Sequence, residues 1–242
     1  MTEPSGERFT GNTRRWDTAL RAYELAPTQL AQLGKLLELL GLDEHAPTTV
    51  RTRDEAAERH LADSLVGLEI DLIGDGRVLA DLGAGAGFPG VPLAVALPHA
   101  RVRLVESQQR KCEFLTRMLA AAQIENASVV CARAEEWTEG LGTHDVVVAR
   151  ALAAQPVVLE YAAPLLRLGG ALVEWRGRRD SDEENTAAAA ATKLGMELRE
   201  VRHVQPFEGA TDRHLHVWLK ASETPSRYPR RAGMARKRPL GA

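Results

Sequence analysis

A glycine-rich turn between two apolar runs places the strongest constraint on this fold. Residues 81–90 read Asp-Leu-Gly-Ala-Gly-Ala-Gly-Phe-Pro-Gly, with apolar runs at 78–80 and 91–97 on either side. This order predicts a strand, a turn and a helix. Glycine tolerates positive φ and lets a ligand approach the backbone, while the start of the helix supplies unpaired N–H groups. The pattern indicates a nucleotide-binding cradle at the switch point of a doubly wound sheet.

The chain beyond residue 77 has the alternating pattern of an α/β fold. Strands are predicted over 78–82, 101–106, 128–132, 145–150 and 171–176, helices over 89–97, 109–122, 156–166 and 182–194, and a closing antiparallel pair over 198–205 and 214–220. Repeated βα units imply a mainly parallel sheet with right-handed crossovers. We therefore predict an α/β, doubly wound, Rossmann-like sheet with an N-terminal helical segment.

Two segments flank this α/β region. Helical apolar spacing over 20–40 and 54–68 predicts the N-terminal helices, with Asp54 as the N-cap of the second. Residues 222–242 carry six basic residues and one acidic residue, a net charge of +5 on a chain whose total is −2. We predict that this tail is too basic and too proline-rich to add to the core. The predicted parts are a helical cap, the α/β domain and a basic tail, at residues 1–70, 71–221 and 222–242.

The composition excludes several classes of protein. Hydrophobic residues make up 44% of the 242 residues, enough for a core. The first ten residues lack the apolar centre of a signal peptide, and no apolar run approaches the ~20 residues that span a bilayer. Cys112 and Cys131 are expected to be buried thiols, not a disulfide or a metal pair. We predict a cytoplasmic monomer that binds neither membrane nor metal.

The glycine run fits two ligand classes. Gly85, Gly87 and Gly90 satisfy G-x-G-x-x-G, the dinucleotide fingerprint, which alone is a weak signal. Asp81, Gly83, Gly85 and Gly87 together match the first motif of a class I S-adenosylmethionine methyltransferase. Asp81 favours the methyltransferase, because a carboxylate at the strand end would repel a pyrophosphate and attract a cationic ligand. A tight turn with no ligand is the third interpretation.

Polar side chains follow three further strands. Glu106 ends the second strand, where a carboxylate accepts hydrogen bonds from ribose hydroxyls in either ligand class. The acidic segment 133–136 follows the third strand, and Arg150 ends the fourth, where a cation could orient a cofactor carboxylate or a substrate phosphate. Each also has a structural alternative: an exposed strand-end acid, a solvated helix start and an ion pair.

Several motifs together resemble one family. They are the segments 81–93, 104–106, 133–136, 148–151 and 164–170, with 59–65 in the N-terminal helices and 228–240 in the tail. This set resembles the ribosomal RNA small subunit methyltransferase G family, also called glucose-inhibited division protein B, over roughly residues 28–240. The run Gly-Phe-Pro-Gly-Val-Pro within the first segment is far more specific than a generic glycine motif.

The resemblance implies a function and a set of contacts. The implied activity is methylation of guanine N7 in the decoding region of 16S ribosomal RNA, with S-adenosyl-L-methionine as the cofactor. The implied cofactor contacts fall on Gly83, Phe88, Ala134, Glu135 and Arg150. The chain departs from the family pattern at 41–50, which lacks the usual Trp-Asn pair and later Asn, and at 175–177, where Trp-Arg-Gly replaces Leu-Lys-Gly.

Methylation at this atom demands little acid–base chemistry. Guanine N7 carries a free lone pair and no proton, so we expect no obligatory general base and no metal. Proximity and orientation supply up to ~7–11 kcal/mol in favourable cases. His60 and Asp63, three residues apart on a predicted helix, are candidates for positioning the base or a phosphate, or else a helix-to-core contact. N7 lies in the groove of A-form RNA that side chains cannot read, so the target base is in a loop or is extruded.

Three alternatives remain from the sequence. The first is a methyltransferase of the same fold that acts on a small molecule or a protein, favoured by the altered segment 41–50. The second is an NAD-dependent oxidoreductase. The third is an RNA-binding protein without catalysis, since the basic tail suits phosphate contacts and these supply much of nucleic-acid affinity.

Overall fold

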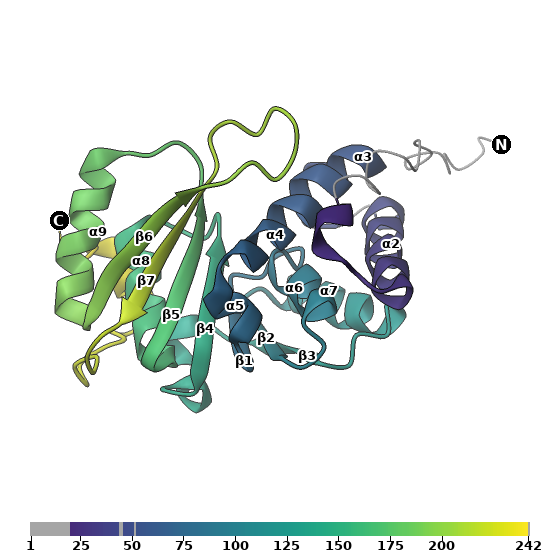
Figure 1. The fold of residues 1–242 in the computed structure, drawn as a ribbon. Coiled ribbons are helices and arrows are strands. Elements are labelled where there is room, and N and C mark those ends of the chain that lie inside the picture. Colours follow the sequence, from purple (N-terminus) through teal and green to yellow (C-terminus); the bar gives the residue numbers. More distant parts are fainter. Residues whose placement is uncertain (1–19, 44–45, 51, 242) are drawn as a thin grey trace.

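The computed structural model describes residues 20–43, 46–50 and 52–241 (Figure 1). Its centre is a seven-stranded sheet in the order β3-β2-β1-β4-β5-β7-β6. All neighbours pair in parallel except β7, which runs antiparallel to both β5 and β6. The strands are β1 (Val78–Leu82), β2 (Arg101–Glu106), β3 (Ala127–Cys131), β4 (His144–Arg150), β5 (Leu166–Arg176), β6 (Met196–His203) and β7 (His214–Lys220). The predicted doubly wound fold is confirmed.

The topological switch point lies between β1 and β4. The chain leaves β1 toward β2 and β3 on one side, then crosses to β4 on the other. Leu82 at the end of β1 pairs with Val105 of β2 and with Ala149 of β4. The carboxyl ends of these three strands therefore meet at one edge, which is where ligands bind in open α/β sheets.

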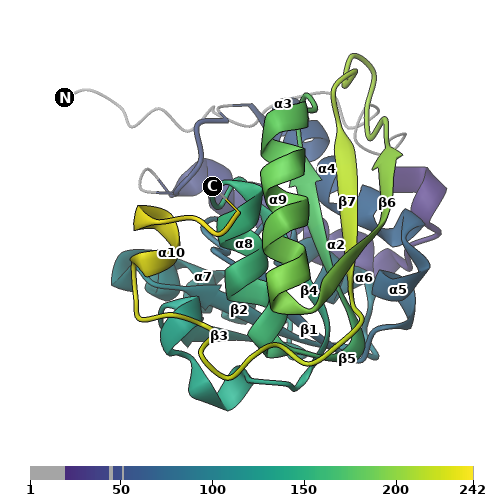
Figure 2. The ribbon, with the colours of Figure 1, turned by 90° about the vertical axis from the view of Figure 1, so that its left-hand side faces the viewer.

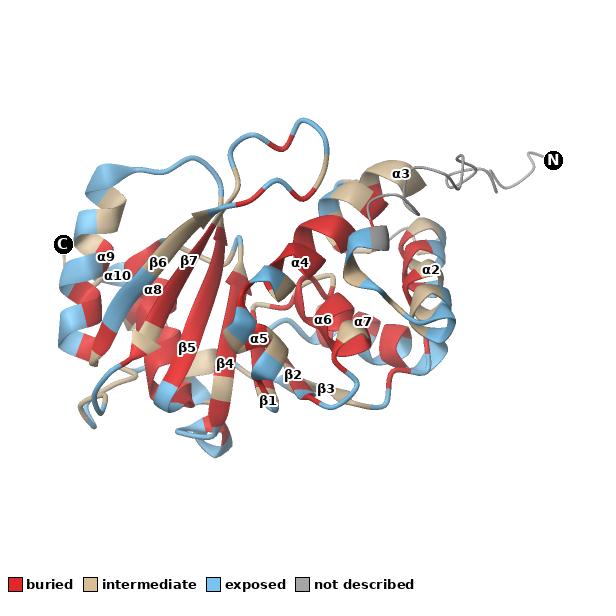
Figure 3. Cartoon of the chain, in the orientation of Figure 1, coloured by how far each residue is buried: buried red, intermediate tan, exposed pale blue. Residues whose placement is uncertain are grey.

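Helices cover both faces of the sheet. The helices between the strands are α6 (Gly90–Ala96), α7 (Gln109–Ala121), α8 (Gln155–Ala162) and α9 (Ser181–Leu194). Successive strand residues serve opposite faces: Leu79 packs with α6 and α7, and Ala80 with α8 and α9. Figures 1 and 2 show the two helical layers, and Figure 3 shows the buried strands between them. Burial on both faces accounts for the nearly continuous apolar runs in the central strands.

The N-terminal helices join the core of the α6 face. They comprise a short 3₁₀ turn (Arg21–Tyr23), α2 (Pro27–Leu42), α3 (Arg53–Ala56), a π-helical stretch (Ala57–Ala62), α4 (Asp63–Leu65), a 3₁₀ turn (Val66–Glu69) and α5 (Asp71–Asp75). The buried leucines of α2 belong to the same cluster as Leu79 of the sheet. The Gln29 side chain donates to the Val95 carbonyl at 2.7 Å, which joins α2 to α6.

Two local predictions are corrected. Thr52, not Asp54, is the N-cap of α3. Thr52 directly precedes the first helical residue, and its hydroxyl accepts from the Glu55 N–H at 3.2 Å.

Cys112 and Cys131 form a disulfide with a Cα–Cα distance of 5.8 Å, since the start of α7 lies beside the end of β3. The thiol prediction was therefore wrong, and Cys131 is exposed, not buried.

The basic tail docks on the α8 face and contains the short helix α10 (Met234–Lys237) (Figure 2). Ala235 is buried in the cluster that contains α8 and α9. Arg230 forms an ion pair with Glu160 of α8. The prediction that the tail adds nothing to the core is therefore wrong. Its positive charge did not keep it in solvent, because α8 supplies a buried acidic partner.

Candidate functional site

The glycine turn leaves no room for side chains at its first position. Gly83 has a φ of 70°, and a Cβ there would lie 2.5 Å from Cδ1 of Leu152. The N–H groups of Gly83 and Ala84 both donate to the Val105 carbonyl, at 2.8 and 3.1 Å. The turn is thus fixed against β2 while the Gly83 backbone stays open to a neighbouring cavity.

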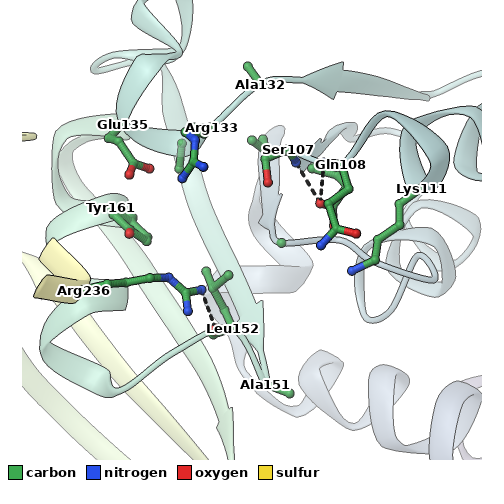
Figure 4. A pocket seen from close by; sticks show the side chains of 14 residues that line it. Ser107, Gln108, Lys111, Ala132, Arg133, Glu135, Ala151, Leu152, Tyr161 and Arg236 are labelled. Carbon is green, nitrogen blue, oxygen red and sulfur yellow. Dashed lines mark hydrogen bonds between the residues drawn. The ribbon is translucent and has the colours of Figure 1, made fainter. Parts of the chain in front are cut away.

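This first cavity has a volume of about 230 Å³ and lies at the carboxyl ends of β1, β2, β3 and β4 (Figure 4). Glu106 of β2 lines it although the residue is only 5% exposed. Its carboxylate accepts from the N–H groups of Gly85 at 3.1 Å, Ser107 at 2.8 Å and Gln108 at 2.9 Å. These bonds hold the carboxylate in one orientation beside the cavity.

The opposite wall combines a loop, a helix and the tail. Ala134 and Glu135 lie in the 3₁₀ turn Ala134–Glu136, Tyr161 on α8 and Arg236 on α10. Glu135 accepts from the Gly233 N–H of the tail at 2.9 Å, and Arg236 donates to the Leu152 carbonyl at 2.9 Å. Sequence reasoning missed five polar lining residues, which are Ser107, Gln108, Lys111, Tyr161 and Arg236. The only sequence signal for Arg236 was the tail motif that contains it. Its contact with Leu152 joins residues far apart in the chain and leaves no local pattern.

Asp81 lies behind the turn and does not line the cavity. It is 1% exposed, and its carboxylate accepts from the Gly90 N–H at 2.8 Å. Burial raises the pKa of Asp81 to about 7, against the Gly90 hydrogen bond, which lowers it. The side chain therefore fixes the start of α6. The argument that its charge selects the ligand is not supported by this placement.

A second cavity of about 460 Å³ opens on the N-terminal side, and Ala151 lines both cavities. Asp63, 4% exposed, lies between two arginines: Arg150 donates to it at 2.7 Å and Arg213 at 3.1 Å. The Trp175 indole N–H donates to the Asp63 carbonyl at 2.5 Å. Asp63 thus joins its own helix α4 to three other elements: β4 and the β6–β7 loop bind its carboxylate, and β5 binds its main-chain carbonyl.

An aromatic stack lies beside the second cavity, which His60 lines and Phe88 does not. The rings of His60 and Phe88 lie 4.5 Å apart and nearly parallel, and the Arg150 guanidinium lies 5.7 Å from the Phe88 centroid. Burial, and then the nearby Arg150, lower the pKa of His60 to about 4, so the imidazole is neutral at pH 7. Its Nε2 is 2.7 Å from the Thr48 hydroxyl. His60 therefore presents a neutral ring, not a cation.

The predicted site residues divide into three groups. Gly83, Glu106, Ala134 and Glu135 line the first cavity. His60, Asp63 and Arg150 line the second. Neither cavity is lined by Asp81, Gly85, Gly87 or Phe88, although Gly85 and Gly87 belong to the glycine turn itself. The cofactor contacts assigned to these residues stay predictions, and Arg150 faces the second cavity.

Comparison with known proteins agrees with the motifs. Residues 28–216 match the family described as rRNA small subunit methyltransferase G. The chain belongs to this family. The "Ribosomal RNA small subunit methyltransferase G" of Chloroflexus aggregans is 37% identical over 240 residues, which cover 96% of this chain and all of that protein. The protein of the same name from Synechococcus elongatus is 34% identical over 240 residues, covering 96% and 98% of the two chains.

Solved structures share the fold of the methyltransferase G family. A "SAM dependent methyltransferase" from Aquifex aeolicus superposes with a TM-score of 0.54 at 16% identity, covering 68% of this chain and 92% of that one. A "predicted O-methyltransferase" from Agrobacterium tumefaciens has a TM-score of 0.50 at 28% identity, covering 67% and 80%. These likenesses agree with the Rossmann-like architecture. The family model and the curated relatives confirm the predicted family, which is a methyltransferase family and not one of oxidoreductases.

Proposed function

We propose that this protein uses S-adenosyl-L-methionine to methylate guanine N7 in the decoding region of 16S ribosomal RNA. Membership of the methyltransferase G family supports both the cofactor and the RNA substrate. The observation that carries the proposal is the pair of cavities that adjoin at Ala151, at the carboxyl ends of the strands beside the switch point. A transfer reaction needs two such sites side by side.

The first cavity fits the cofactor. Glu106 is a nearly buried acceptor held by three backbone N–H groups, which suits the vicinal hydroxyls of a ribose. Gly83 lines this cavity with its backbone, and its φ of 70° is a conformation that side-chain-bearing residues rarely adopt. We infer that these two residues, with the turn at Ala134 and Glu135, hold the adenosine part. When bound, the cofactor supplies a methyl group activated on a sulfonium sulfur.

The second cavity suits a nucleotide of RNA. Its lining includes five arginines and a single carboxylate that is already paired, so its net charge is positive. The arginines are Arg59, Arg150, Arg176, Arg178 and Arg213. Phosphate contacts by such side chains position a nucleic acid and supply affinity. This charge favours RNA over a neutral small molecule as the acceptor.

The chemistry required of the protein is orientation. N7 of guanine has no proton to lose, so no side chain has to accept one. The buried Asp63 is suited to hold the arginines in place. His60, neutral at pH 7, is suited to hold Phe88 through their stacked rings. Asp63 fixes two guanidinium groups at once, so their remaining N–H donors point to defined positions. Proximity then supplies much of the rate increase.

Ribosomal RNA provides the direct test. RNA from cells with and without the gene is mapped for 7-methylguanosine, and the purified protein is supplied with labelled S-adenosylmethionine and unmodified small subunits. We expect one guanine to lose its modification in the deletion strain and to gain label in vitro. RNA binding without methyl transfer would instead favour the non-catalytic alternative.

The described residues contain no helix long and apolar enough to cross a membrane. The cytoplasmic location and the monomeric state of the protein stay predictions.

A further inference from the structure

The C-terminal tail contributes a wall to the first cavity. Arg236 of α10 lines the cavity together with Tyr161 of α8 and residues of the sheet edge, all of which are more than 70 positions earlier in the chain. Figure 4 shows the Arg236 side chain crossing below Tyr161 toward Leu152, on the side of the cavity opposite Gln108 and Lys111. The segment that carried the strongest local charge in the sequence therefore ends beside the ligand site.

Three contacts fix the tail in this place. Arg230 binds the buried Glu160 carboxylate through Nε at 2.7 Å and Nη2 at 2.5 Å. The Gly233 N–H donates to Glu135, itself a cavity residue, at 2.9 Å. Arg236 donates through Nη2 to the Leu152 carbonyl. Two of these contacts reach residues of the cavity wall directly, so docking of the tail and the shape of the cavity are linked.

The chemistry of this wall suits a nucleobase. Glu135 supplies an acceptor, Tyr161 a hydroxyl and Arg236 further N–H donors, while Ala132, Ala134 and Leu152 supply small apolar surface. An adenine edge presents both an amino donor and ring-nitrogen acceptors, and its faces are apolar.

We propose that Arg236 is a cofactor-binding residue that contacts the adenosine part of the ligand. This inference rests on the proposed use of S-adenosylmethionine. The guanidinium has five N–H donors, of which one binds the Leu152 carbonyl and another the Tyr161 side chain, which leaves donors for the ligand. The tail is then part of the cofactor site and not only an RNA-binding extension.

The test compares two neighbouring cations of the same short helix. Arg236→Ala removes the proposed contact, whereas Lys237→Ala removes the same charge from an exposed side chain that lines neither cavity. Calorimetric titration with S-adenosylhomocysteine gives the affinities, and thermal unfolding of the ligand-free variants checks the fold. We expect Arg236→Ala to weaken binding by about tenfold or more, as loss of a charged hydrogen bond predicts, and Lys237→Ala to leave it within about twofold.

Two further measurements locate the contact. Binding of 5′-methylthioadenosine, which lacks the amino-acid end, should weaken by the same factor in Arg236→Ala. A crystal structure of the wild-type complex should place the guanidinium within hydrogen-bond distance of the ligand. Equal binding by wild type and Arg236→Ala, an equal loss in Lys237→Ala, or a loss confined to S-adenosylhomocysteine would overturn the inference. Failure of the wild type to bind S-adenosylhomocysteine would instead refute the proposed function.

Discussion

Removal of Arg230 should measure how strongly the tail is attached. Arg230 binds Glu160 with two guanidinium nitrogens and its backbone N–H, and Glu160 is only 1% exposed. Loss of one member of a buried pair leaves a charge without its partner and costs about 3–5 kcal/mol. Detachment of the tail would let water reach Glu160 and reduce this cost. We therefore expect Arg230→Ala to lower the free energy of unfolding by about 3 kcal/mol, the lower end of that range.

Urea unfolding followed by tryptophan fluorescence measures the change in the free energy of unfolding, since Trp175 and Trp218 are buried in the core. Arg231→Ala is the matched control, because Arg231 is the adjacent residue and is exposed. Glu160→Gln should recover part of the loss when combined with Arg230→Ala, because a neutral amide is less costly to leave unpaired than a carboxylate. A loss below about 1 kcal/mol, typical of an exposed ion pair, would refute the buried-pair argument.

Three other perturbations test the turn and the second cavity. The raised pKa of Asp81 means that its protonated form stabilises the native state below pH ~4 and that this contribution is lost as pH rises to about 7; Asp81→Asn should flatten that decline in the unfolding midpoint, and an unchanged pH profile would contradict it. Gly83→Val should abolish binding of S-adenosylhomocysteine in a folded protein, because the new side chain would be strained at a φ of 70° and would displace Leu152, which lines the first cavity; normal titration would show that the turn is misassigned. Asp63→Ala should lower methyl transfer to RNA by at least tenfold while cofactor affinity stays within twofold, because Arg150 loses its anchor; unchanged transfer would remove Asp63 from the acceptor site.

The regular elements of the α/β domain could be predicted from sequence because local patterns determine them. The strand over 101–106 and the strand over 214–220 were predicted with the bounds that the structure gives. Buried parallel strands are continuous apolar runs, and the glycine turn has its own signature. β5 was predicted too short, since Leu166 already pairs with His144 before an irregularity in the ladder. Such an irregularity depends on the neighbouring strand and has no local signal.

The contacts between distant elements could not be predicted. Glu106 was placed correctly because its position at a strand end is local information. Arg236, Tyr161 and the disulfide were missed, because each depends on which elements the fold brings together. Asp81 shows the converse error. Its sequence position suggested a ligand contact, but the fold turns the carboxylate toward the N–H of Gly90, a group that also belongs to the motif.

The end of β4 explains how one short loop can serve both cavities. Arg150 faces the second cavity and Leu152 the first, while Ala151 between them lines both and has a positive φ of 53°. An alanine rarely adopts this conformation, so the surrounding contacts must hold it. Asp63 binds the side chain of Arg150, which precedes Ala151. Arg236 donates to the carbonyl of Leu152, which follows Ala151. The N-terminal helices and the C-terminal tail therefore fix, from opposite sides, the loop that lines both cavities.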